Sequence, residues 1–154
     1  MLVINGFEIV PGVNLQSAKI EYMNFHGANM SNANCRFAYM RGSHMVAVNL
    51  QYANLQYASL EEANLEFALL NESNASGTSF EHAQLSCAVL EGANLQGANF
   101  WGADCRDVNF RNANLENVNF SCADLQGADF TGAILTNADF TDANLFETIL
   151  DTVS

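Results

Sequence analysis

The sequence predicts an all-β solenoid in which the chain turns a corner every five residues and four sides close one coil. Three observations predict this fold. Each multiple of five from Leu15 to Leu150 carries an apolar residue, and these make 28 units in unbroken register. The residue two positions earlier is Ala in 19 of these units, and the residue directly before is Asn or Asp in 18. A repeat of such short period decides the architecture before any local propensity is considered.

Neither regular secondary structure explains this period. In an α-helix, residues five apart lie about 140° out of phase, which would spread the apolar set around the cylinder. In a flat strand, an odd step moves the side chain to the opposite face. A corner after every five residues lets the apolar residue and the small residue before it point inward each time. Asn and Asp suit such corners because their side chains bond to nearby backbone.

The segment AVLEGANLQGANFWGADC, residues 88–105, resembles the A(D/N)Lxx motif of the pentapeptide repeat family almost unit by unit. The resemblance covers roughly residues 13–150, and it implies a right-handed quadrilateral parallel β-helix of about seven coils, each of about 20 residues. We therefore expect an N-terminal cap over 1–12, the β-helix over 13–150 and a C-terminal tail over 151–154. The cap is expected because residues 1–12 lie outside the repeat and end at Pro11-Gly12, which contains the single proline.

A coil of this length places residues 20 apart directly above one another, which predicts the core. One face begins with Ile20, Met40 and Leu60 and continues with a column of phenylalanines. Aromatic stacking adds about 0.5–1.5 kcal/mol per pair beyond burial, so the C-terminal half should be the stiffer half. The expected core residues are Phe80, Phe100, Phe120 and Phe140 in this column, Phe110 and Phe130 on the opposite face, and Leu95.

Two stretches depart from the repeat without changing its register. Over 71–80, Ser73, Ala75 and Thr78 replace inward residues, so we expect looser packing or a bend there. In the other stretch, residues 41–45, Ser43 takes the position that is usually Ala. The string Gly42-Ser43-His44-Met45 is also what a cleaved expression tag leaves behind, and the sequence is compatible with a native segment or with such a junction.

Composition and charge narrow the partners and the cellular setting. The net charge is −12, which disfavours nucleic acid and anionic membranes as direct partners and suits a cationic protein surface. No apolar run approaches the roughly 18 residues of a membrane span, and the first residues lack the basic region of a signal peptide. We therefore expect a cytoplasmic protein.

Candidate chemistry is sparse. Cys35 and Cys105 take inward positions and Cys87 and Cys122 outward ones, with no pair at disulfide spacing, so we expect free thiols. His82 shares a column with Cys122, but two coils separate them by about 9.6 Å, too far to share a zinc ion. A rod without loops offers no water-excluding cleft for catalysis. We expect no catalytic residue, no metal and no cofactor.

The outward positions must then carry the function, and in the N-terminal half they are unusually aromatic. A cluster of exposed aromatic side chains favours a protein-contact patch, so we expect a non-enzymatic protein-binding or scaffold module whose partner is unknown. The same rings could instead shield corners or edge backbone. Binding of carbohydrate or another small ligand is a third possibility, for which the sequence offers no groove. The candidate patch consists of Phe37, Tyr39, Tyr52, Tyr57 and Phe67.

The resemblance adds an alternative function. Some pentapeptide repeat proteins are similar to B-form DNA in width and charge, and they bind DNA gyrase or topoisomerase IV, inhibiting these enzymes or protecting them from quinolone drugs. Sparse charge in the first three coils, the absence of a projecting loop and the absence of a C-terminal helix weigh against it. The candidate DNA-mimic surface consists of Asp107, Asp124, Asp129, Asp139 and Asp142.

The C-terminal end suggests self-association. Nothing in the sequence after Leu150 resembles the N-terminal cap, so the last coil is expected to expose apolar side chains and unpaired backbone. A homodimer through this coil is therefore a further hypothesis. The side chains expected at this end are Leu135, Phe140, Leu145 and Leu150.

Overall fold

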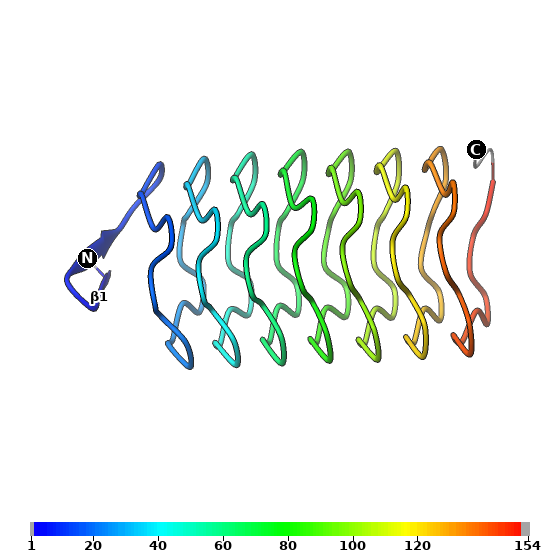
Figure 1. Ribbon diagram of the computed structural model, residues 1–154, viewed down its shortest axis with the longest axis horizontal. Helices are drawn as coiled ribbons and strands as arrows, with labels where there is room; N and C mark the ends of the chain where they lie inside the picture. The colour runs from blue at the N-terminus through cyan, green and yellow to red at the C-terminus, as the bar shows by residue number, and fades with distance from the viewer. Residues whose placement is uncertain (1, 152–154) are drawn as a thin grey trace.

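The computed structural model describes residues 2–151, which form a short hairpin followed by a four-sided coil that rises regularly along one axis (Figure 1). Beyond the hairpin, residues 20 apart pair in parallel, from Asn14 with Asn34 to Asp129 with Ile149. The chain is the all-β, right-handed quadrilateral parallel β-helix that the sequence predicts. Residues 152–154 of the expected tail lie outside the described residues.

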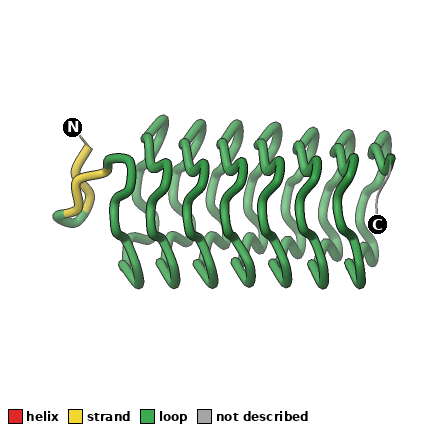
Figure 2. Tube along the Cα trace, turned by 90° about the horizontal axis from the view of Figure 1, so that it is seen from above, coloured by secondary structure: helices red, strands yellow, loops and turns green. Residues whose placement is uncertain are grey.

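The N-terminal hairpin lies at one end of the rod (Figure 2). Strand β1 (Leu2–Ile4) pairs antiparallel with β2 (Phe7–Ile9). Ile4 and Ile9 are each 7% exposed and join the apolar core of the coil. The hairpin therefore buries apolar surface against the end of the solenoid that would otherwise meet water.

The backbone hydrogen bonds explain why five residues form the unit. In a typical unit of the inner coils, three amide groups donate to a neighbouring coil and a fourth closes the turn, so the ladder runs along all four sides. Around the first unit the bonds run from the amide of Leu15 to Asn34 O (2.7 Å), Ser17 to Arg36 O (2.9 Å), Asn34 to Val13 O (2.9 Å) and Ala18 to Leu15 O (3.0 Å).

The fifth amide explains the preference for Asn and Asp. At all 18 units where one of these residues precedes the central apolar residue, its Oδ1 accepts the amide two positions further on, at 2.9–3.3 Å. We call this contact the Asx cap. It satisfies the one amide that neither the ladder nor the turn engages.

Each corner requires one residue whose backbone has the left-handed conformation, with a positive φ. The second residue after each central apolar residue, from Ser17 to Glu147, has φ between 55° and 72°. Val, Ile, Thr and Pro do not occur at these positions, because a β-branched side chain or a fixed negative φ is incompatible with this region. Glycine occupies only some of them. Most carry larger side chains, such as Tyr57 with φ 56°, which project outward.

The core contains two stacked aromatic columns on opposite sides. Phe100 stacks between Phe80 and Phe120 with centroid distances of 4.6 and 5.0 Å, and Phe140 continues the column at 5.4 Å from Phe120. Across the core, Phe110 stacks on Phe130 at 5.0 Å. The two columns meet edge-on, which is the favourable arrangement for aromatic quadrupoles. Leu95 is fully buried on a third side.

The chain keeps its register through 71–80, where the sequence predicted looser packing or a bend. Asn74 pairs with both Asn54 and Asn94, as in the other coils. The hydroxyl of Thr78 donates to Leu55 O at 2.6 Å, which satisfies a polar group inside the core. Ser43 is accommodated in a similar way, since its hydroxyl donates to Ile20 O and accepts the amide of Met23, both at 3.1 Å.

Candidate functional site

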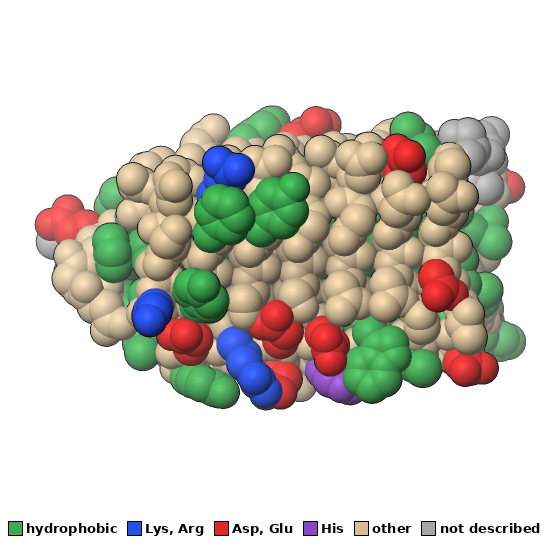
Figure 3. All heavy atoms as spheres, viewed as in Figure 1, with side chains coloured by type: hydrophobic (Ala, Val, Ile, Leu, Met, Phe, Trp, Pro, Cys, Tyr) green, Lys and Arg blue, Asp and Glu red, His purple; other side chains and the backbone are tan. Residues whose placement is uncertain are grey.

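An exposed aromatic stack occupies one corner of the rod in two consecutive coils. The rings of Phe37 and Tyr57 stack at 5.5 Å and 13°, and the Arg36 guanidinium carbon lies 4.6 Å from the Phe37 centroid. Both rings project outward because Phe37 and Tyr57 occupy the turn position whose backbone has the left-handed conformation. We call Arg36, Phe37, Tyr39 and Tyr57 the aromatic corner. Figure 3 shows apolar and basic side chains grouped on the N-terminal half of the face in view.

The structure divides the predicted aromatic patch. Left-handed residues five apart lie at successive corners, so Tyr52 lies one corner before Tyr57 and Phe67 lies at the corner diagonal to it. Both are well exposed, at 61% and 57%. Tyr39 lies two residues beyond Phe37, on the adjoining side. Phe37, Tyr39 and Tyr57 therefore form one group, which Tyr52 and Phe67 do not join.

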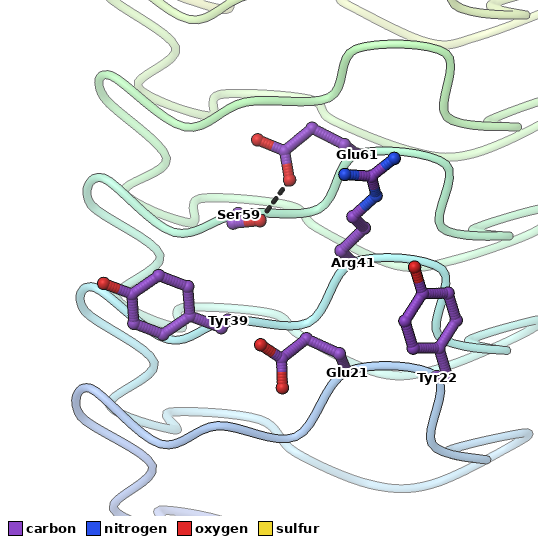
Figure 4. A pocket seen from close by; sticks show the side chains of 6 residues that line it. All are labelled: Glu21, Tyr22, Tyr39, Arg41, Ser59 and Glu61. Atoms are coloured by element: carbon purple, nitrogen blue, oxygen red, sulfur yellow. Dashed lines mark hydrogen bonds between the residues drawn. The ribbon is translucent and has the colours of Figure 1, made fainter.

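Tyr39 also borders a hollow of about 550 Å³ on the adjoining side of the rod (Figure 4). The side chains that line it come from three consecutive coils, so the hollow extends along the rod axis. The lining residues are Glu21, Tyr22, Tyr39, Arg41, Ser59 and Glu61.

The hollow lies where the Asx caps are missing. On this side, the cap position is occupied by Lys19, Tyr39, Ser59 and Ser79 in four consecutive coils. As a result, among residues 2–151 the amides of Glu21, Arg41 and Glu61 donate to no acceptor. Asn99 restores the cap one coil later by accepting the amide of Trp101 at 3.1 Å.

Some charged side chains at the hollow form ion pairs and others do not. The guanidinium of Arg41 bonds to Glu62 at 2.6 Å, and this contact raises the pKa of Arg41 above its ordinary value. The Ser59 hydroxyl donates to the carboxylate of Glu61. Within the described part of the chain, neither Glu21 nor Glu61 forms an ion pair. Arg41 also interacts with Glu61 through its charge, so the hollow presents one carboxylate without a cation beside it, that of Glu21, next to two tyrosine rings.

Three of the five candidate DNA-mimic aspartates belong to the turns. Asp124, Asp129 and Asp139 are Asx caps that accept the amides of Gln126, Thr131 and Thr141. Hydrogen bonds from the hydroxyl and amide of Thr141 lower the pKa of Asp139. Burial acts to raise the pKa of Asp129, but bonds from Thr131 and Arg111 outweigh it and lower the value.

The other two candidate aspartates have no such role. Asp107 and Asp142 are left-handed corner residues with φ of 56° and 58°, and their carboxylates accept no hydrogen bond among the described residues. The candidate set is spread over three sides of the rod, because Asp129 and Asp139 each lie on a different side from Asp124. It therefore forms no single acidic face.

The cysteines separate into two buried and two exposed thiols. Cys35 and Cys105 fill the core, and burial raises the pKa of Cys35 to about 12 and that of Cys105 well above its ordinary value. Cys87 and Cys122 are exposed and free. Over residues 2–151, no three His, Cys, Asp or Glu side chains gather in a metal-binding arrangement. His82 instead packs its ring on Trp101, edge-on at 4.7 Å.

Sequence reasoning missed the neighbours that lie 18 residues apart. The residue after each central apolar residue contacts the cap position of the next coil. This relation stacks His26 on His44 at 5.5 Å and pairs Arg111 with Asp129 at 3.2 Å. It also brings Glu21 next to Tyr39 in the hollow, a site that the spacing of 20 residues alone did not reveal.

Comparison with known families and structures identifies the repeat. The model of the pentapeptide repeat family matches in 8 copies, over residues 12–45, 43–71, 49–86, 63–102, 102–137 and 113–151. No curated protein sequence matches the chain significantly. No helix among the described residues is long and apolar enough to cross a membrane.

Solved structures of several repeat proteins are similar to the chain. QnrB1, described as a plasmid-mediated fluoroquinolone resistance protein, is 19% identical, with 90% of this chain and 84% of that chain covered and a TM-score of 0.49. HetL from the cyanobacterium Nostoc sp. strain PCC 7120, described as involved in heterocyst differentiation regulation, is 26% identical (93% and 89% covered, TM-score 0.31). A second Nostoc PCC 7120 pentapeptide repeat protein, alr5209, is 26% identical (72% and 84% covered, TM-score 0.44).

Proposed function

The chain belongs to the pentapeptide repeat family, and we propose that it is a non-enzymatic binding module that contacts another protein through the aromatic corner. The architecture uses the inward residues and the caps, so the outward side chains are what can distinguish one partner from another. The exposed thiols of Cys87 and Cys122 support a reducing, cytoplasmic setting for this module.

The observation that carries the proposal is the exposed stack of Phe37 on Tyr57 beside Arg36. Tyr and Arg are enriched among the residues that dominate binding energy at protein interfaces, and aromatic rings bury a large area at low entropic cost. The stack is held rigid because both residues belong to turns that the ladder fixes. A net charge of −12 further favours a basic partner, through faster and more selective encounter.

Affinity capture with matched variants tests the proposal. The double variant Phe37→Ala/Tyr57→Ala should lose its partner, with binding weakened roughly tenfold or more. The control, Tyr52→Ala/Phe67→Ala, removes the same kind of rings at other corners and should retain it. Quantitative mass spectrometry of the captured proteins, followed by calorimetry with the purified partner, measures the difference. Equal loss in both variants would contradict a contact at the aromatic corner.

The last described coil supports a second contact, with another copy of the chain. Leu145, Phe146, Ile149 and Leu150 are 41–61% exposed there, whereas Leu135 and Phe140 pack partly against the core. We infer that these exposed side chains favour a homodimer. Light scattering coupled to size exclusion should show a dimer that Leu145→Glu converts to a monomer. A strict monomer at high protein concentration would contradict the inference.

The acidity of the chain supports an alternative function, mimicry of DNA toward gyrase or topoisomerase IV. The observation in its favour is the net charge of −12, with Asp107 and Asp142 as the candidate carboxylates that no turn engages. A gyrase supercoiling assay with increasing protein, with and without a quinolone, tests it. Inhibition or drug protection that Asp107→Asn/Asp142→Asn removes would favour mimicry. No effect would leave the aromatic corner as the contact site.

A further inference from the structure

We propose that the hollow between Glu21, Tyr22 and Tyr39 receives a basic side chain, Lys or Arg, of the partner protein. This inference rests on the proposed protein-binding function and specifies the chemistry of the partner. The hollow adjoins the aromatic corner through Tyr39, so one partner surface can cover both. The occupant follows from the shape, the charges and the exposed rings of the hollow.

The shape suits a side chain presented by a protein. The hollow has a volume of about 550 Å³ and is open to solvent, so it can hold the end of a side chain but does not enclose a free small molecule. The hollow lies on the outer surface of the coil, with Tyr39 and Tyr22 on either side and Glu21 below in the view of Figure 4. A long, narrow side chain fits between the two rings, while its backbone stays outside the rod.

The charges select a cation. The positive charge of Arg41 is already matched by Glu62 at 2.6 Å. Arg41 also interacts with Glu61 through its charge, so Glu21 is the carboxylate of the hollow that has no cation beside it among the described residues. Lys19 lies one coil below Tyr39 in its column but does not line the hollow. An ammonium or guanidinium group placed beside Glu21, between the rings of Tyr22 and Tyr39, would be attracted by this carboxylate.

The tyrosine rings add a second attraction for the same group. Tyr22 and Tyr39 are 68% and 47% exposed, so each ring presents surface for a cation–π contact. Tyr22 is held against the backbone of Gly42, where an added methyl group would lie 2.4 Å from its Cε1 atom. One wall of the hollow is therefore preorganised, which lowers the entropic cost of binding.

The missing caps complement this arrangement. The unengaged amides of Glu21, Arg41 and Glu61 can donate to backbone carbonyl oxygens of the segment that carries the basic side chain. An anionic group would also attract these amides, but the carboxylate of Glu21 would repel it. The combination of free donors, tyrosine rings and this carboxylate therefore selects a neutral backbone with a positive side chain.

A titration followed by ¹H–¹⁵N NMR tests the proposal on the full chain. The probe is acetyl-Gly-Arg-Gly-amide or its Lys counterpart, and the comparison peptide carries norleucine, which has a similar length and no charge. We expect chemical-shift changes confined to the residues that line the hollow. The affinity read from them should be roughly threefold lower for the norleucine peptide or for the Glu21→Gln variant, and added salt should lower it as well. Glu66→Gln, a matched glutamate at the same turn position on another side, should leave the shifts unchanged.

The outcomes separate this inference from the proposed function. Equal shifts with norleucine, shifts spread over the rod, or no shift at all would overturn the hollow as a cation site. Glu21→Gln preserves shape, and Glu21 makes no described side-chain bond, so a folded variant is expected and thermal unfolding checks it. If capture of the partner depends on Phe37 and Tyr57 but is unaffected by Glu21→Gln and Tyr39→Phe, the proposed function stands and this inference fails.

Discussion

The ring of Tyr57 lies across the backbone of Gly77, one coil further along the rod. A methyl group added at Gly77 would lie 2.6 Å from the Cδ1 and Cε1 atoms of Tyr57, closer than real side chains approach. Gly97 occupies the same corner one coil later with nearly the same φ, 66° against 65°, and has no neighbour within 4 Å of such a methyl group. The two glycines therefore differ in surroundings and not in backbone.

Gly77→Ala should destabilise the rod more than Gly97→Ala. Both changes place Ala in the left-handed region, which the corner tolerates, since Ala47 has φ 55°. Only the change at Gly77 displaces the ring of Tyr57, and because this ring is 56% exposed we expect a loss below the roughly 1–3 kcal/mol of overpacking in a buried core. Urea unfolding measures the two free energies. In a Tyr57→Ala background the difference should vanish, and its persistence would contradict steric conflict with the ring.

Phe120→Ala should be among the most damaging single changes. Phe120 stacks at 5.0 Å on Phe100 and 5.4 Å on Phe140, and it meets Phe110 and Phe130 edge-on. Truncation leaves a cavity in a fully buried column, which costs about 3–5 kcal/mol. Thermal and urea unfolding should show this loss. Phe146→Ala, which truncates a ring that is 61% exposed, should cost far less.

Asn99→Ala should lower stability by about 0.5–2 kcal/mol, the usual cost of removing a side-chain cap of a backbone amide. Asn99 accepts the amide of Trp101 at 3.1 Å and the side-chain amide of Asn119 at 3.0 Å. Ser79→Ala is the matched control, because Ser79 occupies the same column one coil earlier and its hydroxyl makes no bond among the described residues. Similar losses in both variants would argue against the Asx cap as the source of stability.

Ser73→Ala and Thr78→Val should change stability in opposite directions. The hydroxyl of Ser73 is buried without a partner among residues 2–151, so its removal should stabilise the rod by about 1 kcal/mol. The hydroxyl of Thr78 donates to Leu55 O at 2.6 Å, so an isosteric apolar replacement should cost about 1 kcal/mol. Unfolding midpoints in urea compare the variants. Destabilisation by Ser73→Ala would indicate that its hydroxyl is satisfied in solution.

The period of five residues was enough to predict which residues face inward and which stack. Phe100 lies between Phe80 and Phe120 because one coil takes 20 residues and these three residues are spaced by 20. That spacing can be read directly from the sequence. The grouping of outward residues was harder to predict. Tyr52 and Tyr57 are close in sequence but lie at different corners, since each unit turns the chain to a new side.

The hollow was not predictable from the spacing alone. It depends on contacts between residues 18 apart, such as Glu21 and Tyr39, and on the caps that are missing at Tyr39 and Ser59. The cap function of Asn and Asp must be known before its absence becomes informative. For the same reason the sequence counted Asp124, Asp129 and Asp139 as recognition carboxylates, although their oxygens accept backbone amides.

Acid should destabilise the rod in part through its aspartate caps. Hydrogen bonds from the hydroxyl and amide of Thr141 hold the pKa of Asp139 below its ordinary value. Because the folded pKa is the lower one, the charged form favours folding. This contribution is present above the unfolded value of about 3.9 and is lost as the pH falls through the folded pKa. The melting temperature should therefore fall as the pH is lowered below about 4.

Thr141→Val isolates this contribution. The change removes the hydroxyl that donates to Asp139 at 2.6 Å and leaves the amide bond at 2.9 Å, so the acid dependence of the melting temperature should become shallower. Thr136→Val is the matched control, because Thr136 follows Ile134 in place of an acidic cap and its hydroxyl makes no bond among the described residues. Circular dichroism melts from about pH 7 to about pH 3 make the comparison. If both variants keep the wild-type slope, the Thr141 hydroxyl does not set the acid response, and the amide and the other caps must account for it.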